Sequence, residues 1–335
     1  MALRWPALRF PTSDARDWRL TLEITVVTIE PQKRPGPPAT MIELFALALI
    51  RAQIAAAAAV LLVLILRPSA RRLFGPRRAY GLWLIVPAAA AAAFFPSLAD
   101  TMNIGAPTRP LGAWAPKLVV LWLAGCAIAT AVLVLRERLF RRRVDQGRAG
   151  PAVMGALWPR IVLPADFTQR FDARERDLIV LHERTHIQRG DPIANLFIAG
   201  AGVLCWCNPM IALAQHFIRI DQELACDATV VALRSDIRTD YARALMKAQM
   251  SGSVSPLACG WATHPLILRV SLLSRREPSL HRDIAGFLTM TFLAIMAMVG
   301  VWSVAPRGPD YRDLRPGLAP QMDPFTGAIT WVQGE

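Results

Sequence analysis

The stretch His182-Glu183-Arg184-Thr185-His186 carries the strongest structural and chemical signal in the sequence. It continues a helical pattern that starts near Asp172 and runs through the apolar residues 178–181. On a helix, side chains four residues apart share a face, so both imidazoles can reach one metal ion, with Glu183 beside them as a base. A surface helix that happens to carry His and Glu is the alternative. The chain has only five histidines, and two at this spacing favour zinc.

A third ligand is predicted downstream, in the run Asp221-Gln222-Glu223-Leu224-Ala225-Cys226-Asp227. Catalytic zinc takes three protein ligands and keeps one position open. Glu223 would complete a set of two histidines and one glutamate, and its apolar neighbours argue against a solvated helix face. Asp227, four residues on, is expected to accept the free N–H of a ligand histidine and so to fix that ring.

The segment between these two motifs, 193–218, is apolar enough to be a membrane span. A crossing would put the motifs on opposite sides of the bilayer, where they cannot share a metal. Asn208-Pro209 resolves the conflict, because Asn at the N-cap and Pro at the first helical position mark a new helix. We therefore predict a helical hairpin, 193–206 and 209–230, that returns to its origin.

Apolar residues make up 54% of the 335 residues, above the roughly 45–50% of soluble domains. The surplus falls in blocks close to the ~20 residues that a hydrocarbon core requires. Four transmembrane helices are predicted, at about 42–66, 79–97, 118–135 and 284–305. The expected fold is an α-helical integral membrane protein with a soluble domain between spans three and four.

The net charge of +13 comes from 38 Lys and Arg against 25 Asp and Glu. Such a charge can indicate nucleic-acid binding, but eleven arginines lie in 67–78 and 136–148, against two basic residues in 98–117. The positive-inside rule therefore places the first loop and the domain 136–283 in the cytoplasm, with the N-terminus and the tail 306–335 outside. No direct nucleic-acid contact is expected.

The cytoplasmic domain is predicted to open with two short strands, near 153–155 and 160–164. The second is a candidate to hold an extended substrate by strand addition. The five cysteines suggest no disulfide framework, and Cys205-Trp206-Cys207 reads as part of an apolar helix. Residues 1–40 contain six prolines and read as a disordered tail or a misassigned extension, with the functional protein beginning at Met41.

Taken together, these motifs resemble the BlaR/MecR-type membrane zinc metallopeptidases, relatives of the β-lactam sensor-transducers. The resemblance covers roughly 41–305 and includes Pro159–Pro164, Pro256–Cys259 and His264–Leu266. It implies a gluzincin-like fold in the bacterial inner membrane and a zinc endopeptidase that cleaves a cytoplasmic helix-turn-helix repressor, or itself, in signal transduction. Antibiotic-sensing members carry a penicillin-binding domain after the fourth span. Residues 306–335 are short and lack S-x-x-K, so sensing by acylation is not expected.

His264-Pro265 followed by Arg269 is similar to an element of the prenyl-protease-type membrane zincins that lies near the metal. This makes His264 a candidate donor to the developing oxyanion, Arg269 a candidate to orient substrate, and Tyr241 the reserve donor. The alternative is that His264 caps a helix and Arg269 is solvated.

The expected partners are Zn2+, the lipid bilayer and a protein substrate, with a second copy of the chain as a further candidate. The rival function is a non-catalytic membrane receptor or scaffold that retains a zincin fold. The intact ligand set and the presence of Glu183 argue against that rival.

Overall fold

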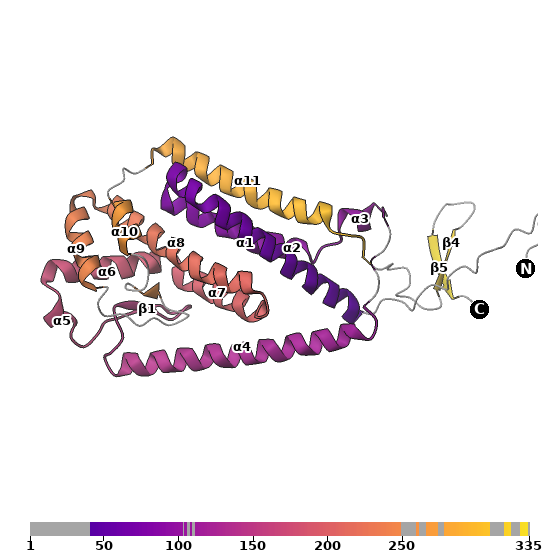
Figure 1. The fold of residues 1–335 in the computed structure, drawn as a ribbon, viewed down its shortest axis with the longest axis horizontal. Helices are drawn as coiled ribbons and strands as arrows, with labels where there is room; N and C mark the ends of the chain where they lie inside the picture. The colour runs from indigo at the N-terminus through magenta and orange to yellow at the C-terminus, as the bar shows by residue number, and fades with distance from the viewer. Residues whose placement is uncertain are drawn as a thin grey trace, which may run out of the picture. The chain divides into compact units, whose positions relative to one another are not determined.

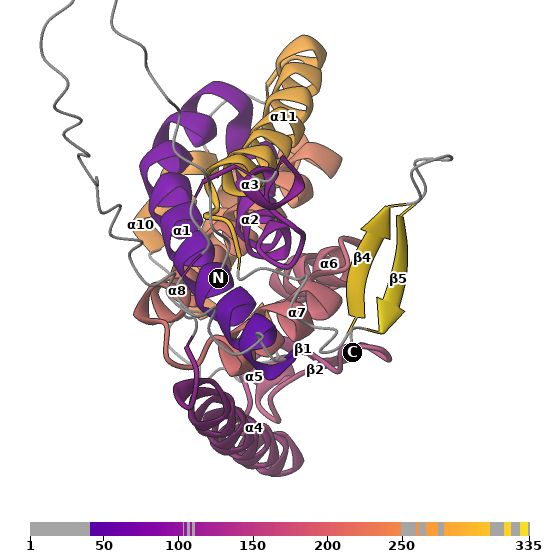
Figure 2. The same ribbon diagram turned by 90° about the vertical axis from the view of Figure 1, so that its right-hand side faces the viewer.

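The computed structural model describes residues 41–102, 104–105, 108, 111–248, 259–260, 266–273, 278–308, 318–322 and 329–333. The predicted extension 1–40, most of the tail 306–335 and His264 lie outside these residues. The described chain is mainly helical, with one long helix, α4 (Trp114–Asp145), on one side of α1 (Met41–Tyr80) and α11 (Leu280–Val304) on the other (Figures 1 and 2).

The first apolar stretch turns back on itself at Gly75. This residue has φ 82° and ψ 166°, a conformation that in practice only glycine adopts. The chain then continues through the 3-10 helix η1 (Gly81–Leu84) into α2 (Ile85–Ala92), which packs against α1. A side chain at position 75 would also meet Pro278 at 2.7 Å. The turn is therefore fixed both by backbone conformation and by close packing.

Within the described residues, three helical stretches are long and apolar enough to cross a membrane. They are Met41–Ala92, Trp114–Asp145 and Leu280–Val304. The first stretch contains the segment predicted at 42–66 and most of the one predicted at 79–97, which ends five residues earlier at Ala92, and the chain folds back between them at Gly75. Large apolar side chains are exposed along the other two, among them Leu121, Ile128 and Phe292. An exposed apolar surface of this extent is typical of helices that face lipid.

A three-stranded sheet follows α4 in the chain. β1 (Ala152–Met154) pairs antiparallel with β2 (Arg160–Val162) and with β3 (Cys259–Gly260), in the order β2-β1-β3. The two strands predicted near 153–155 and 160–164 are thus present, each one or two residues shorter or shifted. β2 lies at an edge of the described sheet.

Side-chain caps mark the starts of three of the remaining helices. The capping box of Asp172 and Glu175 starts α6 (Ala173–Gln188), and the side chain of Asn208 accepts a hydrogen bond from the Met210 amide at the start of α8 (Pro209–Leu233). α7 (Asp191–Leu204) packs against α8, so the predicted helical hairpin is confirmed. The others are α5 (Phe167–Arg170), η2 (Ser235–Ile237), α9 (Arg238–Ala248), α10 (Leu266–Leu273) and α3 (Leu98–Thr101).

The tail contains one feature that the sequence analysis does not predict. β4 (Leu318–Met322) and β5 (Ile329–Gln333) pair antiparallel, with Leu318 opposite Gln333 and Met322 opposite Ile329. A pair of strands is marginally stable by itself.

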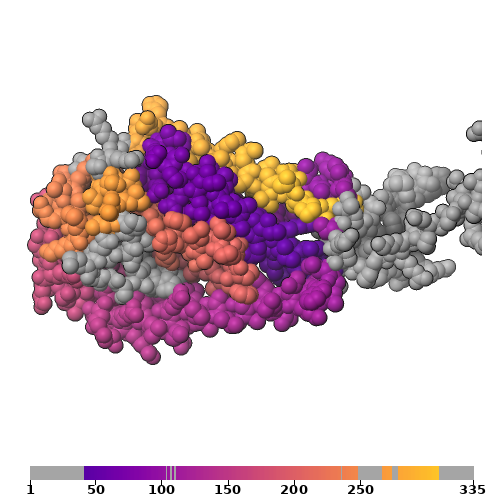
Figure 3. Space-filling model, viewed as in Figure 1, coloured from indigo at the N-terminus to yellow at the C-terminus, as the bar shows by residue number. Residues whose placement is uncertain are grey.

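Helix α8 belongs to two buried clusters. Ile211 and Ala214, in its first half, pack with α1, α2 and α11 around Val60, Val63 and Leu82. Cys226 and Val230, in its second half, pack with α6 and α9 around Ile179 and Tyr241. In the space-filling view, the α7–α8 region lies between the indigo first stretch and the magenta α4 (Figure 3). One helix therefore connects the apolar bundle with the part of the chain that carries the metal motif.

Candidate metal centre

Two packed helices bring the predicted site residues together. α6 carries His182, Glu183 and His186, and α8 carries Glu223 and Asp227. Each of these residues is at most 2% exposed. Charged and polar groups are rarely buried so completely unless they are paired or bind a metal. Each of these buried groups is therefore expected to have a hydrogen-bond partner, an ion-pair partner or a metal.

The Nε2 atoms of the two histidines and the Glu223 carboxylate converge. Nε2 of His186 lies 3.0 Å from Nε2 of His182. Glu223 Oε2 is 3.4 Å from the His182 Nε2, and Oε1 is 3.5 Å from the His186 Nε2. In a tetrahedral zinc site with bonds of about 2.0–2.1 Å, donor atoms lie roughly 3.3 Å apart. These three donors have the spacing that one such ion requires.

The opposite ring nitrogens are held by neighbouring groups. Nδ1 of His182 lies 2.6 Å from the Tyr241 hydroxyl, and Nδ1 of His186 lies 2.7 Å from Asp191 Oδ2. Hydrogen bonds of this kind fix the ring orientation and the tautomer, and leave Nε2 free for a metal. Asp191 was missed in the sequence analysis. Its signal is Gly190, whose φ of 74° ends α6 and turns the chain back toward His186.

Asp227 does not hold His182 in the simple way predicted. Its Oδ1 atom is 3.4 Å from the His182 Nδ1, whereas the Tyr241 hydroxyl is closer and donates to Asp227 Oδ1 at 2.8 Å. Tyr241 thus lies between the carboxylate and the ring. This position is on the Nδ1 side of His182, away from the converging Nε2 atoms, which argues against Tyr241 as a donor to substrate.

Arg269 is neither solvated nor open to substrate, so both readings of it made from the sequence are corrected. It is 2% exposed, and its Nε and Nη2 atoms donate to the two oxygens of Asp227, each at 2.7 Å. Nη2 also lies 3.3 Å from Glu223 Oε2. A buried guanidinium with two carboxylates offsets their charge and fixes their geometry. Arg269 therefore positions Glu223.

The protonation states favour cation binding. Burial lowers the pKa of His182 to about 4, so its ring is neutral, the form that ligates metals. The pKa of Glu223 lies well below its usual value: burial opposes this shift, but the charges of His186 and Arg269 outweigh burial. Glu223 Oε2 and both Glu183 oxygens are buried and accept no hydrogen bond from the described residues. A cation with its bound water would satisfy such acceptors.

Burial raises the pKa of Glu183 to about 8. A carboxyl group with a pKa near neutrality is suited to take up and release a proton at physiological pH. Glu183 therefore has the environment of a general base.

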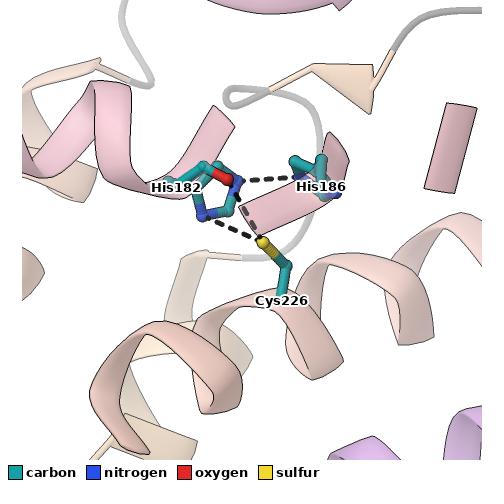
Figure 4. Close-up of side chains that lie close together, drawn as sticks. All are labelled: His182, His186 and Cys226. Atoms are coloured by element: carbon teal, nitrogen blue, oxygen red, sulfur yellow. Dashed lines mark hydrogen bonds between the residues drawn. The ribbon is translucent and has the colours of Figure 1, made fainter. Parts of the chain in front are cut away.

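Cys226 is an alternative third donor, because one donor atom from each of His182, His186 and Cys226 lies within 4.8 Å of the other two (Figure 4). Its Sγ atom, however, is 3.6 Å from the Nδ1 of His182, which Tyr241 already occupies. Burial also raises the pKa of the Cys226 thiol to about 12, and only the thiolate binds metals well. The geometry favours Glu223 over Cys226.

The family model "BlaR1 peptidase M56" matches residues 47–273, more than half of the chain. The chain belongs to this family. Methicillin resistance mecR1 proteins of Staphylococcus aureus and Staphylococcus epidermidis are 29% identical to it over 83 residues, which is 25% of this chain and 14% of each relative. The match thus spans a small part of those relatives. Membership of the family, together with the three apolar stretches, indicates a membrane protein of the metallopeptidase type.

Proposed function

We propose that the chain is a membrane-embedded zinc endopeptidase with His182, His186 and Glu223 as ligands. The proposal rests on the convergence of the three donor atoms at 3.0–3.5 Å beside the Glu183 carboxylate, which accepts no hydrogen bond within the described residues. Two imidazoles and one carboxylate form a common ligand set of catalytic zinc. When bound, zinc supplies a Lewis acid that polarises the scissile carbonyl and acidifies water.

The side chains around the centre have separate roles in this proposal. Glu183 accepts a proton from the attacking water at its carboxylate and delivers it to the leaving amine. Tyr241 and Asp191 hold the two rings with Nε2 facing inward. Arg269 keeps Glu223 in place and ionised. His264, the sequence-based candidate for the oxyanion donor, lies outside the described residues and remains a prediction.

The topology proposed is four spans in the bacterial inner membrane, with residues 136–283 in the cytoplasm. The turn at Gly75 supports it, because the turn splits the first apolar stretch into two antiparallel helices. The arginines of 67–78 then lie at the same end of the bundle as those of 136–148, as the positive-inside rule requires.

The proposed substrate is a cytoplasmic regulatory protein, such as a helix-turn-helix repressor, or the chain itself. Membership of the family supports this class of substrate. The edge position of β2 in the described sheet also supports it, because an unpaired edge can bind an extended peptide by strand addition.

The test uses the full-length protein in lipid, with zinc content and peptide cleavage measured on the same samples. We expect about one zinc per wild-type chain, little zinc in His186→Ala, and zinc without activity in Glu183→Gln. Loss of the base should slow cleavage by roughly 100-fold or more. Cleavage by Glu183→Gln at the wild-type rate would remove Glu183 from its role. Zinc-loaded wild type that cleaves neither itself nor a repressor encoded nearby would favour the scaffold alternative.

A further inference from the structure

A cavity of about 160 Å³ lies where α1, α8, α10 and α11 meet. By the same kind of measure, one water needs roughly 10–15 Å³, so the space admits a polyatomic group. Five arginines contribute to its lining: Arg71, Arg72, Arg77, Arg269 and Arg282. Asp227 is the one acid among its described lining residues, and it is already bound by both arms of Arg269. The lining therefore carries an excess of positive charge.

Three of these arginines have donors that the described residues do not satisfy. The Nη1 atom of Arg71 is buried without a hydrogen bond, and its ion pair with Asp221, at 3.6 Å, is shared with Arg67. Arg72 and Arg282 are exposed at the mouth, and neither forms a hydrogen bond or ion pair within the described part of the chain. A buried donor without an acceptor, such as Nη1 of Arg71, is costly, and the exposed guanidinium groups of Arg72 and Arg282 each carry five donors. An anion with several acceptor oxygens would satisfy them.

The walls of this cavity are held in a fixed shape. Gly75 packs so closely on Pro278 that a Cβ would come within 2.7 Å, and a Cβ at Gly286 would come within 2.9 Å of Phe74. An ion pair between Arg78 and Asp283 joins the same two helices. A site that is rigid before binding loses little entropy when the ligand enters.

The surroundings indicate which kind of anion would enter. Planar guanidinium groups match phosphate oxygens in pairs, so clustered arginines favour phosphate. The cavity lies beside Gly75, where the first apolar stretch reverses direction, and the lining residue Leu73 is 57% exposed. We propose that this cavity binds the phosphate group of an anionic ligand, with the headgroup of an anionic phospholipid as the favoured source.

An occupied cavity would also steady the candidate metal centre. Asp227 and Arg269 form part of the lining, and Arg269 contacts Glu223. The bound phosphate thus stabilises the packing of α8 and α10 that holds these groups. Binding itself does not depend on the proposed peptidase activity, so it is tested without an activity measurement.

The experiment compares the thermal unfolding of full-length protein in phosphatidylcholine nanodiscs with and without phosphatidylglycerol. The test variant is Arg72→Ala/Arg282→Ala. The matched control is Arg142→Ala/Arg143→Ala, which removes the same charge from an exposed part of α4. We expect phosphatidylglycerol to raise the Tm of the wild type and the control. The test variant should need on the order of tenfold more ligand for each arginine removed.

Further arms identify the source of the phosphate. Inorganic phosphate added to protein in neutral nanodiscs should give no shift if a lipid headgroup is the ligand. A full shift with inorganic phosphate would retain the site but make a free phosphate its ligand. Oleate, which is anionic but has no phosphate, should give a weaker shift than phosphatidylglycerol, and an equal shift would overturn the phosphate assignment.

Two outcomes would contradict the proposal that the cavity binds an anion. One is an unchanged wild-type Tm in phosphatidylglycerol. The other is an equal response of the two double variants, which would mean that only net charge matters. Arg72→Lys/Arg282→Lys guards against misfolding as a cause, because it keeps the charge but not the paired donors. It should lose part of the response, and full retention would contradict recognition by guanidinium groups.

Discussion

Removing the Tyr241 hydroxyl tests most directly how the imidazole ring of His182 is held. Tyr241→Phe removes the group 2.6 Å from the His182 Nδ1 and keeps the ring that fills the core. Loss of such an outer hydrogen bond lowers metal affinity by roughly 10–100-fold. Competition with a zinc chelator would measure this change. Tyr80→Phe, which removes a hydroxyl bonded to Gln222 at 3.4 Å, is the control and should bind zinc as the wild type does. Equal affinity of both variants would contradict the role of Tyr241.

Glu183 gives a pH dependence with a definite sign. Burial raises its pKa from 4.5 to about 8, so the folded protein binds this proton more tightly than the unfolded chain. Stability contributed by the protonated group is therefore lost as pH rises from about 4.5 to about 8. Without metal, Glu183→Gln should exceed the wild type in unfolding free energy at pH 8, by up to roughly 5 kcal/mol. The difference should vanish toward pH 4.5. Denaturant unfolding in the presence of a chelator measures this free-energy difference at both pH values. A stability gain of Glu183→Gln that does not change with pH would contradict a raised pKa of the buried Glu183 carboxyl.

The metal-binding residues of the site were easier to predict from the sequence than the residues that hold them in place. His182, Glu183 and His186 are near neighbours on one helix, and helical spacing alone brings them together. Tyr241 lies 59 residues from His182, and Arg269 lies 42 residues from Asp227. Contacts over such separations follow from how α9 and α10 pack on α8, which no local pattern specifies.

Among the contacts between helices, those of Asp221 join α8 to the first apolar stretch. It accepts a hydrogen bond from the Trp83 Nε1 at 2.8 Å and lies 3.4 Å from the buried Arg67 guanidinium. Asp221→Asn leaves that cation without its counter-charge, which typically costs about 3–5 kcal/mol. Thermal unfolding in detergent should show a large fall in Tm. Asp236→Asn breaks the exposed pair with Arg234 and should cost about 0–1 kcal/mol. Similar effects of the two substitutions would contradict the link.

Helix ends were predictable where a capping residue marks them. Asp172 and Asn208 give the starts of α6 and α8 within a residue, and Asn208-Pro209 also gives the hairpin. The turn at Gly75 was not predicted. Its conformation depends on contact with Pro278, about 200 residues later in the chain, and such a tertiary contact leaves no periodic signal.

The whole molecule is predicted to cross the membrane four times with the metal centre inside. Reporter fusions after residues 105, 170 and 320 should read outside, inside and outside, because eleven arginines flank the proposed cytoplasmic segments. The fusions at 105 and 320 serve as internal controls of opposite sign to the one at 170. An outside signal at 170 would overturn the topology and separate the centre from any cytoplasmic substrate.

X-ray absorption at the zinc edge of the full-length protein is the measurement that tests the central claim most directly. His182, His186 and Glu223 as ligands predict nitrogen and oxygen donors at about 2.0–2.1 Å and no sulfur shell near 2.3 Å. The spectrum should be unchanged in Cys226→Ala, whereas Glu223→Ala should lose an oxygen donor or the metal. A sulfur shell that disappears in Cys226→Ala would contradict the account and make Cys226 the third ligand.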